Sequence, residues 1–325
     1  MRVVVTGGRG FIGLPVVRRL VGRGDRVVAI VRDPDTAGEL ADLGVELRRG
    51  DLSRTAAIVD AMRGTDGVVH LAGSYRIGIP RRERPTMLDQ NLGATNRVLD
   101  AAATAGLERI VHVSTVNAFG NTRGKIVDET YRRDVTKGFV SYYDETKYLA
   151  HVAARELADS GAPILIAMPG TTYGPDDHSQ MGEQLQQAYE GRLRITGMTD
   201  VGVSPTHVDD VAAAIVAMLS QGRVGESYIL AGRNMRLSEA LEIAAKVGGH
   251  AAPRITVPMG LIRAVASLGP MGSKLANQPN FAEVVSASDG VTYWASSAKA
   301  SLKLGYAPRD LEAGIRDSFA GHSWT

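Results

Sequence analysis

The sequence contains no cysteine among its 325 residues. This absence excludes disulfide bonds, thiolate catalysis and zinc sites built on cysteine, and it is compatible with a reducing cytoplasm. The seven histidines are scattered and form no His-x-x-x-His pair, so we expect no metal site.

The sequence also has no large excess of charge of one sign and no long apolar runs. The net charge is +2 and residues of both signs are interspersed, so the sequence shows no basic patch of the kind that binds nucleic acid. No uncharged apolar stretch approaches the roughly 18 residues that cross a bilayer. The first expected strand begins at residue 2, which leaves no room for a signal peptide. We therefore expect a cytoplasmic protein that has neither nucleic acid nor membrane as a partner.

Residues 2–13 carry the most informative pattern in the chain. Residues 2–5 have the pattern of a buried strand, a turn containing four glycines follows, and an amphipathic run at helical spacing comes next. Glycines let the backbone approach a pyrophosphate closely, and the helix behind them aims its free N–H groups at that charge. The pattern predicts dinucleotide binding. The alternative is an ordinary tight turn between a strand and a helix.

Short apolar runs recur along the chain, with helical segments between them. They cover residues 27–31, 45–47, 68–71, 110–113, 164–168 and 228–230. Strands that alternate with helices imply a parallel sheet covered on both faces. We therefore predict an α/β fold with a doubly wound parallel Rossmann sheet and a ligand at the carboxyl ends of its strands.

After residue 170 this alternation breaks down. Residues 171–203 and 232–325 are richer in Pro, Gly and Met, with a helix expected at 237–247. We predict a dinucleotide-binding domain of residues 1–170 plus about 204–231. The remainder, about 171–203 plus 232–325, is expected to form a smaller, partly discontinuous substrate-binding lobe.

A tyrosine and a lysine stand one helical turn apart in the helix expected after Ser141. Ser141 has the place of an N-cap, Tyr143 falls in the first turn, and Lys147 follows on the same face. A free phenol titrates near about 10, and a nearby ammonium group together with the positive end of the helix dipole favours phenolate. The spacing predicts an acid/base pair. The alternative is a surface Tyr–Lys pair.

Two hydroxyl residues, Ser114 and Thr115, follow the strand expected at 110–113. In a doubly wound fold a hydroxyl at the carboxyl end of a strand faces the ligand crevice, where it can hydrogen-bond a substrate oxygen. The alternative is a hydroxyl that satisfies the last backbone groups of the strand.

Several motifs together make the chain similar to a known family. In order they are Thr6-Gly7-x-x-Gly10-x-x-Gly13, Gly50-Asp51-Leu52, His70-Leu71-Ala72-Gly73, Asn91-x-Gly93-x-Thr95, Ser114-Thr115, Tyr143-x-x-x-Lys147, Pro169-Gly170-x-x-Tyr173-Gly174-Pro175 and His207-Val208-Asp209-Asp210-Val211-Ala212. The chain resembles the extended short-chain dehydrogenase/reductases, the NAD-dependent epimerase/dehydratase superfamily. The likeness covers nearly the whole chain and is strongest over residues 1–215.

The resemblance implies roles for the matching positions. Thr115 would be the catalytic hydroxyl, Tyr143 the general acid/base, and Lys147 the residue that lowers the pKa of Tyr143 and binds the nicotinamide ribose. The implied cofactor contacts are Gly7, Arg9, Gly10, Phe11, Ile12, Gly13, Arg32, Asp51, Leu52, Leu71, Ala72, Gly73, Asn91, Val113, Tyr143, Lys147, Pro169, Gly170, Thr171 and Thr172. The expected substrate contacts are Ser74, Tyr75, Thr115, Asn117, Tyr142, Tyr173 and His178. His207 is expected to support a loop or the core.

Departures from the family pattern favour one reaction. Dehydratases place Asp-Glu after the catalytic Thr, where this chain has Val116-Asn117, which supplies no acid/base pair. Epimerases have an arginine that grips the substrate diphosphate where this chain has Val203, and the arginine common before the Pro-Gly motif is Met168 here. The chain is therefore closer to the dihydroflavonol-reductase-like and 3β-hydroxysteroid-dehydrogenase-like members.

We accordingly expect carbonyl/alcohol interconversion on a small to medium, partly apolar substrate. A nucleotide-sugar epimerase is the alternative, and a non-catalytic cofactor-sensing regulator is a third. Regulators of this kind typically lose the Tyr–Lys pair, which is present here.

The cofactor and the assembly state follow from the same resemblance. Arg32, at the end of the second strand, matches the arginine that binds the 2′-phosphate of NADP(H), and Arg9 offers a second cation. Asp33 keeps NAD(H) open as the alternative. The helices expected near 91–105 and 143–160 carry apolar residues on more than one face, and their family equivalents pair in a homodimer. The alternative is that these faces are covered by the chain itself.

Overall fold

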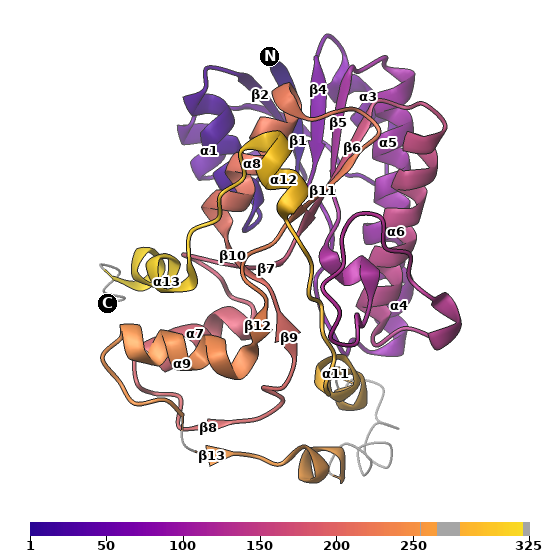
Figure 1. Cartoon of the computed structure of the whole chain (residues 1–325). Coiled ribbons are helices and arrows are strands. Elements are labelled where there is room, and N and C mark those ends of the chain that lie inside the picture. Colours follow the sequence, from indigo (N-terminus) through magenta and orange to yellow (C-terminus); the bar gives the residue numbers. More distant parts are fainter. Residues whose placement is uncertain (254, 265–279, 321–325) are drawn as a thin grey trace.

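The computed structural model describes residues 1–253, 255–264 and 280–320, and its centre is a seven-stranded sheet (Figure 1). All its neighbouring strands are parallel, in the order β11-β6-β5-β4-β1-β2-β3. The strands are β1 (Arg2–Thr6), β2 (Arg26–Val31), β3 (Glu46–Arg49), β4 (Gly67–His70), β5 (Arg109–Val113), β6 (Ile164–Pro169) and β11 (Ser227–Leu230). The predicted doubly wound fold is confirmed. Its topological switch point lies between β1 and β4.

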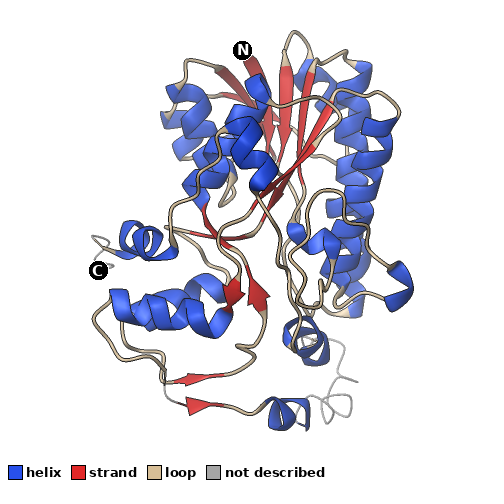
Figure 2. Ribbon diagram, in the orientation of Figure 1, coloured by secondary structure: helices blue, strands red, loops and turns tan. Residues whose placement is uncertain are grey.

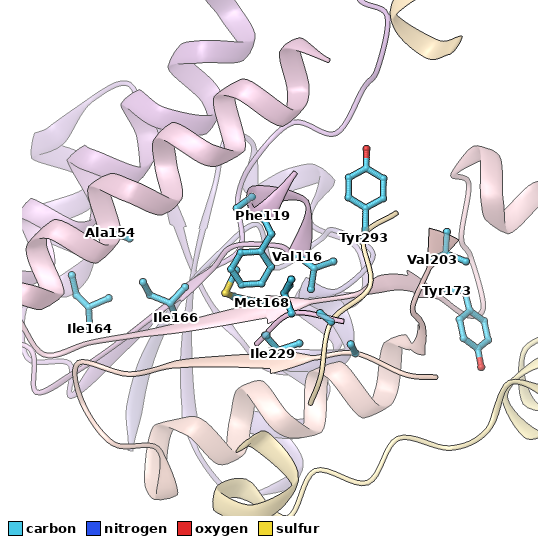
Figure 3. Packing of buried hydrophobic residues seen from close by; sticks show 14 of the residues in the cluster. Val116, Phe119, Ala154, Ile164, Ile166, Met168, Tyr173, Val203, Ile229 and Tyr293 are labelled. Atoms are coloured by element: carbon cyan, nitrogen blue, oxygen red, sulfur yellow. The ribbon is translucent and has the colours of Figure 1, made fainter. Parts of the chain in front are cut away.

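Side chains from alternate positions of each strand pack into two hydrophobic cores, one on each face of the sheet. Val3 and Val5 belong to the core beneath α1 (Gly13–Gly22) and α8 (Val208–Gln221). Val4, between them, belongs to the other core. The helices over that second core are α3 (Thr55–Met62), α5 (Ala94–Thr104) and α6 (Tyr142–Asp159). In Figure 3, Phe119 and Met168 lie close together in this core. The two cores bury both faces of the sheet.

The second half of the chain adds short strand pairs and helices below the sheet (Figure 2). The pairs are β7 (Thr171–Tyr173) with β10 (Pro205–His207), β9 (Gly202–Val203) with β12 (Met235–Arg236), and β8 (Ile195–Thr196) with β13 (Ile255–Thr256). The helices below the sheet are α7 (Gln180–Tyr189), α9 (Leu237–Val247), α11 (Phe281–Ser288) and α13 (Leu311–Phe319), whereas α12 (Ala298–Leu304) lies beside the sheet (Figure 1). The predicted helix 237–247 is confirmed as α9. The two-domain division stays a prediction, and residues 254, 265–279 and 321–325 of the expected lobe lie outside the described residues.

One segment of that expected lobe returns to the sheet. Helix α12 packs against α8 and β11, and its residues Ala300 and Leu304 lie in the same buried core as Val211 and Ile215 of α8. The carboxyl-terminal part of the chain therefore contributes to both halves of the molecule.

The two helices expected to form a dimer interface differ in how deeply their apolar residues are buried. The first begins as a π-helical turn (Asp89–Gly93) before α5, and its Val98 and Leu99 are fully buried in the chain's own core. Leu149 and Val152 of α6 are only partly buried. Part of the apolar surface is thus covered by the chain itself, and the homodimer stays a proposal.

A buried ion pair ties the loop before α6 to that helix. Both terminal nitrogens of Arg133 donate to the Asp144 carboxylate, at 2.7 and 2.6 Å, and the two side chains are 6% and 1% exposed. Asp144 also accepts from the Val140 N–H at 3.1 Å, and the Arg133 guanidinium lies 4.4 Å from the centre of the Phe139 ring. The segment before the helix is therefore held by charge inside the protein.

We predict that Arg133→Met destabilises the protein by about 3–5 kcal/mol, because it leaves the Asp144 charge buried without its partner. Urea unfolding at pH 7 measures this change. The double variant Arg133→Met/Asp144→Leu should recover much of the loss, since no unpaired charge is left behind. If the double variant is as unstable as the single one, the loss comes from packing and this account is wrong.

Candidate active site

The turn between β1 and α1 is shaped by glycines that no other residue can replace without strain. Gly7 has φ +73°, and a Cβ there would lie 2.7 Å from the backbone nitrogen of Ala72. A Cβ on Gly13 would lie 2.0 Å from the carbonyl oxygen of Gly7. The Gly10 N–H donates to that carbonyl at 2.9 Å and closes the turn. Phe11 and Ile12, which lead into α1, are partly buried. The resulting close-packed backbone has the form that a pyrophosphate needs.

A chain of buried side chains joins the two strands of the switch point. Thr6 Oγ1 and His70 Nδ1 are 2.7 Å apart, and His70 Nε2 lies 3.2 Å from Thr95 Oγ1. Because Thr6 and His70 are aligned in the parallel register, this bond fixes where β1 and β4 end. The partly buried Leu71 and Ala72 follow directly, and Gly73 is exposed. The loop expected to line the cofactor therefore starts from a fixed point.

Asn91 supports this loop instead of lying open to a ligand. Its Oδ1 accepts from the Ser74 N–H at 2.7 Å, and its Nδ2 donates to the Ser74 carbonyl at 3.1 Å and to Thr146 Oγ1 at 2.9 Å. The residue is 3% exposed. Both amide hydrogens are thus in use, and the expected cofactor contact of Asn91 stays a prediction. Asn91 links the loop to α6.

Three arginines gather near the end of β2. Arg9 Nη1 donates to Thr36 Oγ1 at 3.1 Å, across the opening of the glycine turn. Arg49 pairs with the carboxylate of Asp33 at 3.1 Å. Arg32 is exposed, and among the described residues it has no hydrogen-bond or ion-pair partner. The charge of Asp33 is therefore neutralised by Arg49, while the Arg32 guanidinium is available to bind a ligand.

The other expected cofactor residues lie at the carboxyl ends of the strands. Asp51 and Leu52 follow β3, and a hydrogen bond from the Ser53 N–H lowers the pKa of Asp51. Pro169 ends β6, Gly170 is buried, and the partly buried Thr171 and Thr172 lie in β7. These residues therefore lie at the same end of the sheet as the glycine turn, the end where the strands have their carboxyl termini.

The expected acid/base pair lies at the start of α6, as the sequence predicts. Ser141 caps this helix, since its Oγ accepts from the Asp144 N–H at 3.1 Å. Tyr143 is 7% exposed, and the ring of Tyr75 meets it edge-on at 4.8 Å between centres. Burial, with smaller contributions from Tyr75, Asp144 and Tyr293, raises the pKa of Tyr143. The expected lowering by Lys147 is thus not found: burial is the main cause, and Lys147 is not among the groups that act on this pKa.

Lys147 and Thr115 are held close to the end of β5. Lys147 Nζ donates to the carbonyl of Val113 at 3.4 Å, and burial lowers the pKa of this lysine to about 8. Thr115 Oγ1 accepts from the Asn117 N–H at 3.2 Å and lies 3.2 Å from Asn117 Oδ1. Thr115 thus caps the short 3-10 helix Val116–Phe119, so both interpretations of this hydroxyl remain open.

Three histidines that the sequence analysis did not anticipate lie near Lys147; His70 and His112 are buried, and His151 is partly buried. His70 and His112 are register partners on β4 and β5, with ring centres 5.5 Å apart. His151, one turn after Lys147, lies 3.1 Å from Ser114 Oγ through Nδ1. Burial and the Lys147 charge lower the pKa of His70 to about 3. Burial followed by the charges of Arg155, Lys147 and Arg132 lowers the pKa of His151 to about 4.

Two further residues on the expected substrate side were also missed. Glu283 of α11 accepts from the Tyr142 N–H at the start of α6, and its other oxygen lies 3.3 Å from Arg84. The Arg84 guanidinium lies 4.8 Å from the centre of the Tyr142 ring. No sequence motif marks these contacts, because Glu283 and Tyr142 are 141 positions apart.

The expected substrate residues differ in how exposed they are to solvent. Tyr75 is 59% exposed and His178 is exposed, whereas Ser74, Asn117 and Tyr142 are partly buried. Tyr173 is a correction: it is 1% exposed, its ring packs against His207, and its hydroxyl lies close to the space where Gly314 has no side chain. It is a core residue. His207 caps α8 through Nδ1, as expected of a supporting residue.

The sequence profile of the NAD dependent epimerase/dehydratase family matches residues 3–231. The chain belongs to this family. It is accordingly an enzyme of the NAD(P)-dependent short-chain dehydrogenase/reductase type, which confirms the resemblance.

Individual members of the epimerase/dehydratase family show how far the likeness extends. A "Putative dihydroflavonol 4-reductase" of Synechocystis sp. is 32% identical over 79% of this chain and 75% of its own length. A 2-alkyl-3-oxoalkanoate reductase of Stenotrophomonas maltophilia is 28% identical over 97% of this chain and 98% of its own. The crystal structure of gox2253 superposes with a TM-score of 0.83 at 30% identity, over 98% of this chain and 96% of that one. In the part of the chain that the structure describes, no helix combines the length and apolarity needed to cross a membrane.

His151 is expected to make the stability of this epimerase/dehydratase family member depend on pH. The pKa of His151 is about 4 in the folded protein and 6.5 in an unfolded chain, so between these pH values the unfolded chain binds more protons. Stability therefore falls as the pH drops from 6.5 to 4. We predict that His151→Gln makes the free energy of unfolding fall less steeply over this window, as measured by urea unfolding at pH 7, 6, 5 and 4. An unchanged slope would show that His151 is accessible and protonated in the folded protein.

Proposed function

We propose that this protein is an NADPH-dependent oxidoreductase that interconverts a carbonyl and an alcohol on a small to medium, partly apolar substrate. The observation that carries the proposal is the arrangement of Tyr143 and Lys147. They stand on one helix at the carboxyl ends of the strands, with Tyr75 against Tyr143. The names of the two relatives, both reductases, support this choice.

A bound nicotinamide would supply the hydride, and the glycine turn fits its dinucleotide because the turn leaves no room for side chains. Proton delivery then falls to this chain's own residues. Since burial raises the pKa of Tyr143, its hydroxyl is protonated at neutral pH and donates to the substrate oxygen as hydride reaches the carbon. The products are the alcohol and a tyrosinate, which solvent reprotonates. Lys147, with a pKa of about 8, is mostly charged at pH 7 and stabilises that tyrosinate.

The charges on the substrate side favour an uncharged or singly charged substrate. The two arginines nearest Tyr75 and Tyr142 are already paired, Arg76 with Glu83 at 2.8 Å and Arg84 with Glu283 at 3.3 Å. Val203 and Met168, where epimerases carry arginines, are 5% and 1% exposed. A nucleotide diphosphate would therefore find no free guanidinium at these positions.

Epimerisation of a nucleotide sugar is the second candidate, because the family includes epimerases. Micromolar binding of a UDP- or dTDP-sugar in calorimetry, with simple carbonyl compounds left unreduced, would replace the present proposal. A cofactor-sensing regulator would bind NADPH and turn over neither class of substrate. A homodimer formed through α5 and α6 and a cytoplasmic location complete the proposal, and they rest on the family resemblance.

The acid/base role is tested by Tyr143→Phe. We predict that kcat falls by roughly 10²–10⁴ with a panel of aldehydes and ketones, while NADPH binding stays intact. Thr115→Ala should have a smaller effect, since a single donor to an oxyanion contributes on the order of 2–4 kcal/mol at most. Tyr189→Phe, in α7, is the matched control and should retain wild-type turnover. Near-wild-type activity of Tyr143→Phe would remove the assignment.

The cofactor preference is tested at Arg32. An exposed guanidinium without a partner suits the 2′-phosphate of NADPH, and the acid that would hold the ribose of NADH is occupied by Arg49. We predict that Arg32→Ala raises KM for NADPH by about tenfold or more and leaves KM for NADH unchanged. Arg194→Ala, an exposed arginine in the second half of the chain, is the control. A wild-type preference for NADH that Arg32→Ala does not alter would contradict the prediction.

A further inference from the structure

Two adjoining cavities lie at the edge of the sheet opposite the β3 edge, four strands from the glycine turn. Their volumes are about 290 and 430 Å³. They are bounded by α6, by residues 128–133 of the loop before it, and by the edge strand β11. Glu129, Arg132, Arg155 and Ser227 line both cavities and mark the space that they share. Strands β6, β5 and β4 stand between this space and the glycine turn that follows β1.

The space exists because a side chain, and not another strand, completes the edge of the sheet. Glu129 Oε1 accepts from the N–H of Ile229 in β11 at 2.9 Å. On the same strand, the Ser227 carbonyl accepts from Lys299 Nζ at 2.9 Å. The loop is thus anchored to the edge strand through Glu129, and Lys299 of α12 binds the same strand.

Two donors in the shared space have no acceptor among the described residues. One is Nε of Arg155, which is buried although the side chain as a whole is 25% exposed. The other is the hydroxyl of Ser227, a residue that is 3% exposed. A buried donor without an acceptor costs about 1–3 kcal/mol, so a ligand that accepts from both would be stabilised.

The residues that line both cavities carry two positive charges, Arg132 and Arg155, and one negative charge, Glu129, whose Oε1 is occupied by the Ile229 N–H. His151 lies one turn before Arg155 on α6 and lines the first cavity. The charges of Arg155 and Arg132 act on it, and they help to lower the pKa of His151 to about 4, so that it is neutral at pH 7. Glu156 and Asp159 are exposed carboxylates that line the first cavity, and Asp159 lies 3.8 Å from Arg155 Nη2, which disfavours a ligand with more than one negative charge.

We propose that this shared space is an accessory binding site for a small organic acid with one carboxylate. The carboxylate accepts from Arg155 and Ser227. An apolar body suits the remaining wall, which is formed by Phe119, Val152 and Met168. A phosphate group suits it less well, because its second charge would face Glu156 and Asp159.

The site would also affect the catalytic helix. His151 touches Ser114 at the end of β5, and both lie next to Lys147, whose charge acts on His151. A carboxylate beside Arg155 adds negative charge, so it would raise the pKa of His151 and of Lys147. This consequence gives the binding test a readout that does not depend on the identity of the substrate.

The experiment uses benzoate as the probe and benzyl alcohol as its neutral match. We expect isothermal titration of the full chain saturated with NADPH to show saturable benzoate binding and none of benzyl alcohol. Arg155→Met should weaken benzoate binding by about tenfold or more, and Ser227→Ala by a smaller factor. Arg194→Met, an exposed arginine far along the chain, should bind as the wild type does. In an NMR titration, the pKa of His151, assigned with His151→Gln, should rise when benzoate is added.

Three results would overturn the proposal. The first is the absence of benzoate binding, the second is binding that Ser227→Ala and Arg155→Met leave unchanged, and the third is binding that NADPH abolishes, which places benzoate in the cofactor site. If Arg155→Met does not fold, Arg155→Lys replaces it, because lysine keeps the charge but lacks the Nε–H donor.

Discussion

The close approach of two chain segments at the switch point is the constraint on which the rest of the structure depends. The turn after β1 and the loop after β4 touch at Gly7 and Ala72, with no space for a single additional carbon. The bond between Thr6 and His70 fixes the register in which they meet. Asn91 then links the loop after β4 to α6, because it hydrogen-bonds both Ser74 of the loop and Thr146 of the helix. The predicted cofactor turn and the predicted acid/base helix are thus placed relative to each other by a continuous set of short, buried hydrogen bonds.

Burial, more than local charge, governs the ionisable groups around the acid/base pair. Lys147 and the helix terminus were expected to favour phenolate at Tyr143, but removal from water raises the pKa of that phenol. The same effect lowers the pKa of Lys147 and of three neighbouring histidines. A protonated tyrosine near a lysine that is mostly charged at pH 7 suits reduction, in which the phenol begins as the donor. The sequence shows which groups are neighbours along a helix, whereas the balance between charge and desolvation depends on how deeply the fold encloses them.

How much could be predicted depends on the distance along the chain between interacting residues. The strand–glycine–helix pattern, the Ser141 cap and the alternation of strands with helices are local signals, and each is confirmed in the structure. Tyr173 was expected to line a pocket because it follows β6, but it is buried by His207 and by Gly314, which come later in the chain. Glu283 left no sequence signal either, and neither did the cavity lining that Arg155 and Ser227 share. Their partners are distant in sequence, and no periodicity or motif connects them.

The return of the carboxyl-terminal chain to the sheet limits how this molecule can be divided. Thr292 joins Thr122, Ala295 bridges to Val127, and Glu283 holds the start of α6, so the last part of the chain supports the loop and helix that carry Tyr143. A fragment that ended after β11 would lack these partners and would leave the core under α12 open to water. The predicted dinucleotide-binding domain therefore depends on the rest of the chain. Grafting a different substrate lobe onto it, by recombination in nature or by design, would succeed only if the new lobe reproduced the contacts at both α6 and β11.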